Sequence, residues 1–103
     1  MNSQIKVIQP QGIFNSKNGN QVRQEVEELV ASDINTILID FQDVTFMDSS
    51  GFSALLMTLK TVRQKNARLV ICSINEQIKM IFEMTNTNQI FEVLPNQASF
   101  KSA

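Results

Sequence analysis

The chain contains no histidine and a single cysteine among its 103 residues. Histidine is the commonest general base and metal ligand near neutral pH, so its absence excludes a Ser-His-Asp triad, a Cys-His pair and a zinc site that uses histidine. The single cysteine, Cys72, cannot form a disulfide within the chain. Because it lies in the apolar run 69–72, we expect a buried, unreactive thiol.

Long hydrophobic runs and an excess of one charge are also missing. The apolar runs are far shorter than the roughly 20 residues that cross a bilayer, and the N-terminus has no signal-peptide hydrophobic region. We therefore expect a cytoplasmic protein without membrane insertion. The net charge of −1 provides no basic surface for a nucleic-acid backbone, so nucleic-acid binding is not expected. The length predicts one domain over residues 1–103.

Short apolar runs typical of strands alternate with periodic segments typical of helices. Strands are predicted at 5–8, from 13, and at 36–41, 68–73 and 90–94, and helices at 22–32, 52–62 and 75–85. Residues 43–47 are expected to form a short connector, and the tail after residue 97 to be frayed or weakly helical. The alternation predicts an α/β fold with a mixed, largely parallel sheet. The short turn after the first strand predicts that the sheet starts with an antiparallel pair.

The segment 46–52 carries two hydroxyls and a carboxylate between a predicted strand and the clearest predicted helix. Asp48, Ser49 and Ser50 are residue types that cap helices, and Gly51 permits a tight start of the helix. On spacing alone, a simple helix cap is the more economical interpretation.

A second interpretation of the same segment is a phosphorylation site. A hydroxyl at a helix N-terminus lies near free backbone N–H groups and the positive end of the helix dipole, where a phosphate can be held. A phosphoserine would add a charge of about −1.5 to −2 at pH 7, which a partner interface could not desolvate cheaply. The two interpretations are compatible, because one hydroxyl can serve as cap and as switch.

Other candidate residues have simpler explanations. Asp40, Asp43 and Asp48 resemble a set of metal ligands, but no histidine or glycine-rich phosphate loop accompanies them, so we assign them to loop solvation and capping. The methionines are expected to fill the core. Met57 is the exception, because it lies off the apolar face of its helix and is a candidate contact residue.

The motif Asp-Ser-Ser-Gly at 48–51, with the pair 46–47 and the run 37–41 before it, resembles the signature of STAS domains. More narrowly, it resembles the free-standing anti-sigma-factor antagonists of bacteria. The strand and helix at 69–85 also match the family, and the resemblance covers residues 5–93. It implies a STAS-like (SpoIIAA-like) α/β fold with helices packed mainly on one face of the sheet.

The resemblance also implies a mechanism. Such proteins bind an anti-sigma factor that is a serine kinase, and this kinase phosphorylates the serine after the Asp, here Ser49, which breaks the complex. A PP2C-type phosphatase resets the antagonist. ATP and its metal belong to the kinase, so we expect no cofactor, no metal and no enzymatic activity on this chain. The expected partner-binding residues are Asn15, Asp48, Ser49, Ser50, Gly51, Phe52 and Met57.

One departure from the family concerns Asn15, because many members carry Asp at this place. Asn keeps the hydrogen bonding but lacks the charge. Two alternatives to the switch stay open at this point. The chain could be a non-switched STAS scaffold subunit of a transporter or of a larger signalling assembly, with Ser49 as a cap only. An enzyme with Ser49 as nucleophile is disfavoured by the absence of histidine.

Overall fold

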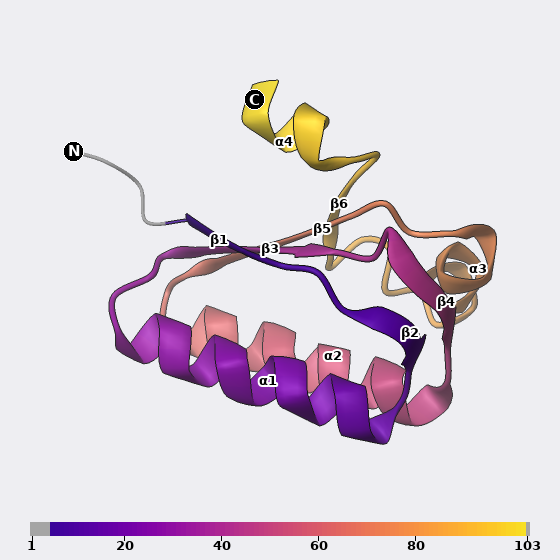
Figure 1. Ribbon diagram of the computed structural model, residues 1–103, viewed down its shortest axis with the longest axis horizontal. Coiled ribbons are helices and arrows are strands. Elements are labelled where there is room, and N and C mark those ends of the chain that lie inside the picture. The colour runs from indigo at the N-terminus through magenta and orange to yellow at the C-terminus, as the bar shows by residue number, and fades with distance from the viewer. Residues whose placement is uncertain (1–4, 103) are drawn as a thin grey trace.

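A four-stranded parallel sheet forms the centre of the molecule (Figure 1). The computed structural model describes residues 5–102. The strands of this sheet, in spatial order, are β1 (Ile5–Ile8), β3 (Thr36–Asp40), β5 (Arg68–Cys72) and β6 (Glu92–Leu94). Each neighbouring pair runs parallel, so helices must carry the chain back between strands. The predicted α/β fold class is confirmed.

A separate two-stranded ribbon pairs β2 (Gln11–Phe14) with β4 (Asp43–Met47), also in parallel. Two predictions were wrong here, since 43–47 is a strand rather than a connector and the start of the sheet is not antiparallel. The reason is that the chain bends after β1 and after β3 without reversing. After β1, Pro10 has no N–H and so cannot extend the pairing of β1 with β3. After β3, the Asp40 carboxylate accepts the Gln42 N–H at 2.9 Å and stabilises a turn of the chain.

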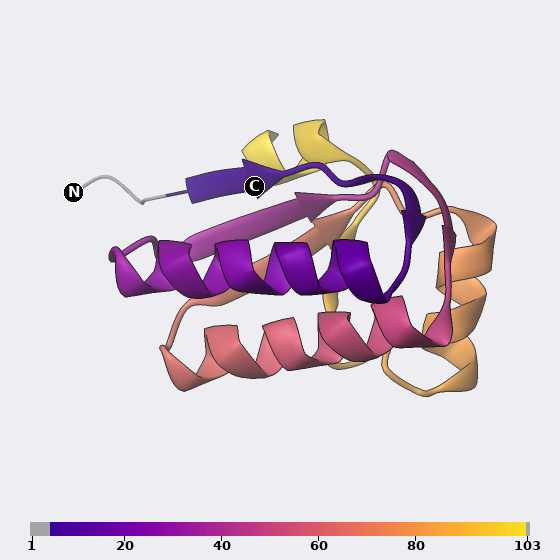
Figure 2. The same ribbon diagram turned by 60° about the horizontal axis from the view of Figure 1, so that its bottom comes forward.

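Two long helices cover one face of the sheet, α1 (Ser16–Ala31) and α2 (Ser49–Gln64), and they lie side by side (Figure 2). Both begin earlier than predicted, because their polar first turns carry no apolar periodicity. Their buried faces and the strands enclose the main core, which includes Val26, Ile37, Leu55 and Ile71.

The two helices approach each other closely at their N-terminal ends. A Cβ added at Gly19 of α1 would lie 2.7 Å from the Cβ of Ala54 in α2, and Gly51 is the next nearest neighbour. Small residues at the contact therefore bring the first turns of α1 and α2 together.

The shorter helices lie elsewhere. Helix α3 (Glu76–Met84) stands at one end of the sheet, and α4 (Gln97–Ser102) lies on the face opposite α1 and α2 (Figure 1). The tail was predicted to be at most weakly helical, and α4 has only six residues. No helix within residues 5–102 has the length and apolar character needed to span a membrane.

A small second cluster fills the face under α4, where Phe100 and Leu94 pack against Leu38, Val70 and Cys72. Cys72 is fully buried, as predicted, and burial raises the pKa of its thiol.

Asp40 corrects an expectation, because it is buried rather than solvated. Its second carboxylate oxygen accepts a hydrogen bond from Nε2 of Gln97 at 2.7 Å. The carboxylate is thus a buried, hydrogen-bonded link between the end of β3 and α4.

Candidate functional site

The segment singled out by sequence forms a corner where β4 ends and α2 begins. Asp48 is the N-cap of α2, and its Oδ1 accepts the Gly51 N–H at 2.8 Å. The Asp48 N–H donates to the Phe14 carbonyl at 3.2 Å, which ties the corner to the end of β2. Asp48 is half-buried, whereas Ser49 and Ser50 are exposed.

The two serines are in the first helical turn and are not the cap. Within the described residues, neither hydroxyl makes a side-chain hydrogen bond, and helix geometry leaves the first N–H groups of α2 without an intrahelical partner. Of the three residue types that the sequence offered as caps, Asp48 provides the side-chain cap, and Ser49 and Ser50 do not. Within the described residues, the Ser49 hydroxyl therefore holds no other group in place. It lies at the positive end of the helix dipole.

Asn15 lies beside this corner although it is 33 positions away from Asp48. It is the N-cap of α1, and its side-chain oxygen accepts the Asn18 N–H at 3.1 Å. The preceding residue, Phe14, holds the Asp48 N–H through its carbonyl. The structure therefore brings both helix caps to the same end of the molecule.

The structure gives Gly51 and Phe52 an internal position. A Cβ at Gly51 would overlap the Phe14 carbonyl, so the absence of a side chain serves the packing of β2 on α2 rather than access for a partner. Phe52 is buried in the main core. Met57 is exposed, but it lies eight residues from Ser49, roughly 12 Å along the helix axis. Met57 is therefore not part of the corner.

Two apolar residues that were not predicted to bind a partner flank the corner. Ile13 of β2 and Phe46 of β4 are register partners, and each is about half exposed, at 50% and 47%. Their neighbours in the next row, Phe14 and Met47, point inward and are buried. We call Ile13 and Phe46 the apolar pair. An apolar strand residue is assigned to the core by default, so only the exposure of these side chains in the folded structure shows that the pair faces outward.

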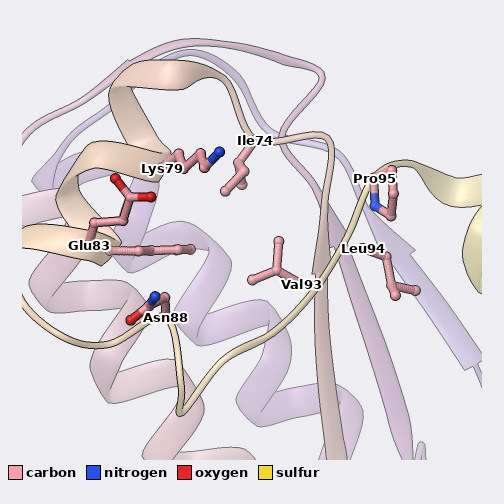
Figure 3. A pocket seen from close by; sticks show the side chains of 8 residues that line it. Ile74, Lys79, Glu83, Asn88, Val93, Leu94 and Pro95 are labelled. Atoms are coloured by element: carbon pink, nitrogen blue, oxygen red, sulfur yellow. The ribbon is translucent and has the colours of Figure 1, made fainter.

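The surface also has hollows. One of about 330 Å³ lies between α3 and β6, where the side chains in Figure 3 surround it. It is lined by Ile74, Lys79, Phe82, Glu83, Asn88, Val93, Leu94 and Pro95. None of these residues belongs to the corner at Ser49. Within residues 5–102, no three His, Cys, Asp or Glu side chains are grouped so that they could hold a metal ion.

Known proteins resemble the chain over nearly its whole length. It is 28% identical to BtrV of Bordetella bronchiseptica, whose name describes a candidate anti-sigma factor antagonist, over 90% of this chain and 84% of BtrV. It is 21% identical to the anti-sigma F factor antagonist of Paenibacillus polymyxa, over 92% of this chain and 82% of the relative.

Solved structures show the same fold. The anti-sigma factor antagonist SpoIIAA of Bacillus has structures in unphosphorylated and phosphorylated forms. The unphosphorylated form superposes with a TM-score of 0.76 at 16% identity, over 99% of this chain and 91% of SpoIIAA. The family profile described as STAS domain matches residues 1–100. The chain belongs to the STAS domain family.

Proposed function

We propose that this chain is an anti-sigma factor antagonist that binds a serine-kinase anti-sigma factor and is released when that kinase phosphorylates Ser49. The observation that carries the proposal is the exposed Ser49 hydroxyl at the start of α2, beside the exposed apolar pair. The names of its relatives and the phosphorylated form of SpoIIAA support it.

Binding and release have opposite physical requirements at this corner. The apolar pair gains free energy when a partner covers it, at about 25 cal/mol per Å² of apolar surface. Phosphorylation places a charge of about −1.5 to −2 on Ser49, next to the Asp48 carboxylate. Covering that dianion would remove its water, and the neighbouring Asp48 carboxylate would repel it, so the complex dissociates.

The chemistry belongs to the partner. The Ser49 oxygen attacks the γ-phosphorus of ATP, the bond from that phosphorus to the bridging oxygen breaks, and ADP leaves while a base of the kinase takes the hydroxyl proton. This chain is a substrate and binding protein rather than an enzyme. A PP2C-type phosphatase then hydrolyses the phosphoserine, and the cycle runs in the cytoplasm.

The test substitutes the charge and measures binding to the kinase by calorimetry. Ser49→Asp is expected to weaken binding at least tenfold, about 1.4 kcal/mol. Ser53→Asp is the matched control, because Ser53 is exposed one turn further along the same helix, and it should change the affinity less than threefold. Mass spectrometry after incubation with kinase and ATP should find the phosphate on Ser49.

Parental affinity of Ser49→Asp, together with an unmodified Ser49, would contradict the switch. That result would favour the non-switched scaffold of a transporter or signalling assembly, in which Ser49 only begins a helix.

A further inference from the structure

Gln77, in the first turn of α3, holds the strand that leads into Ser49. Its Nε2 donates to the Met47 carbonyl at 2.8 Å, and its Oε1 accepts the Met47 N–H at 2.9 Å. Only this orientation of the amide satisfies both backbone groups. A side chain that pairs with both groups of one residue takes the place that a neighbouring strand would occupy on the free edge of β4.

The peptide unit between Met47 and Asp48 is consequently fixed at both of its polar groups. Its carbonyl accepts from Gln77, and its N–H donates to the Phe14 carbonyl at 3.2 Å. This unit comes directly before the cap of α2, so its orientation decides where the first turn of the helix begins and where the Ser49 hydroxyl lies.

Asn75 extends the same contact along β4. Its Nδ2 lies 3.3 Å from the carbonyls of both Val44 and Thr45, while its Oδ1 caps α3 by accepting the Ile78 N–H. The start of α3 therefore forms hydrogen bonds with β4 over most of the length of the strand. Among these bonds, those of Gln77 are nearest to Ser49 in the sequence.

We propose that Gln77 is a positioning residue for phosphorylation, holding the Met47–Asp48 peptide so that the Ser49 hydroxyl is presented to the kinase. The inference rests on the proposed function. Small misplacements of a reacting group lower transfer rates steeply. The apolar pair is instead placed by the pairing of β2 with β4, in which the Gln77 side chain takes no part. Loss of the Gln77 bonds should therefore lower kcat and leave KM nearly unchanged.

The kinetic experiment uses the serine-kinase anti-sigma factor with ATP and compares three variants with the parent. Gln77→Leu removes both bonds. Gln77→Glu keeps an acceptor for the Met47 N–H but loses the donor to the Met47 carbonyl. Gln97→Leu is the matched control, because Gln97 is also half-buried and its amide bonds Asp40 on the opposite face of the sheet.

We expect kcat to fall at least tenfold in both Gln77 variants, with KM within twofold of the parent and with the control at the parental kcat. A kcat of Gln77→Leu equal to that of the parent would overturn the inference. An equal fall in Gln97→Leu would also overturn it, because the effect would then follow general stability.

Amide hydrogen exchange on the isolated chain separates this inference from the proposed function. In Gln77→Leu, protection of the Asp48 N–H should fall at least tenfold more than protection of the Val70 N–H in the central strand. Unchanged relative protection of Asp48 would refute the role of Gln77 whatever the kinase does. A parent chain that no kinase phosphorylates would instead refute the proposed function, and the exchange result would still decide whether Gln77 holds the corner.

Discussion

Gly51 shows how one missing side chain allows the corner to form. The Phe14 carbonyl and ring lie where a Cβ would be, and the Phe14 carbonyl also accepts the Asp48 N–H. The same contact therefore sets the closeness of β2 to α2 and the position of the helix cap. Any larger residue must push a backbone segment away, because a carbonyl cannot rotate aside as a side chain can.

We predict that Gly51→Ala lowers the free energy of unfolding by about 3 kcal/mol, the upper part of the usual range for overpacking. Urea denaturation followed by circular dichroism measures the change. Ser50→Ala, at the exposed neighbouring position, is the control and should stay within about 0.5 kcal/mol of the parent. A Gly51→Ala protein as stable as the control would show that β2 can shift without cost.

In the proposed function, the ribbon of β2 and β4 is the element that provides the docking surface next to Ser49. One side of its rows, with Phe14 and Met47, enters the core, and the other side exposes the apolar pair. The ribbon is held by α3 on one edge and leads directly into both helix caps. The apolar pair and the hydroxyl that the proposed function assigns to phosphorylation thus lie at the same corner of the molecule.

We predict that Ile13→Ser and Phe46→Ser each weaken binding to the anti-sigma factor at least tenfold, because each removes apolar surface that the partner would cover. Calorimetric titration measures the affinity, and thermal unfolding should confirm that stability changes by less than about 1 kcal/mol. Met84→Ser is a matched control, since Met84 is 75% exposed on α3 and lies outside the ribbon. Equal losses in all three variants would remove the special role of the apolar pair.

At the scale of the whole molecule, the two faces of the sheet carry apolar cores of unequal size. Helices α1 and α2 bury one face in the main core, while α4 covers the other with Phe100 and leaves Cys72 in a thin apolar cluster. Burial raises the pKa of the Cys72 thiol above its usual value. The folded state therefore keeps the thiol protonated at a pH where the unfolded chain releases the proton.

This difference predicts that stability is lost as pH rises. Below about pH 8.5, the usual pKa of an unfolded thiol, both states are protonated and the contribution of Cys72 is fully present. Above it, only the unfolded state ionises, so the free energy of unfolding declines until the pH passes the raised pKa of the folded state. Urea titrations between pH 7.5 and 10 measure the slope. The same slope in Cys72→Ala would show that other groups cause it.

Periodicity and residue type were sufficient for much of this molecule. The apolar spacing of residues 52–62 predicted the core of α2, and the mostly apolar, β-branched run 36–41 predicted β3. These features depend on neighbours within one or two turns, so they are visible in a local stretch of chain. The exposed hydroxyl after Asp48 was likewise inferred from the motif and its place before a helix.

What the sequence determined by itself was the α/β class and the place of Ser49 at a helix start, because both follow from short-range spacing and capping chemistry. Only the tertiary structure decided that 43–47 pairs with β2, that Ile13 and Phe46 face outward, and that Gln77 holds Met47 from 30 positions away. Pairing register and side-chain contacts between distant segments depend on how the helices pack on the strands. The packing energy comes from residues that are far apart in the sequence, so no pattern within a short stretch of chain reveals it.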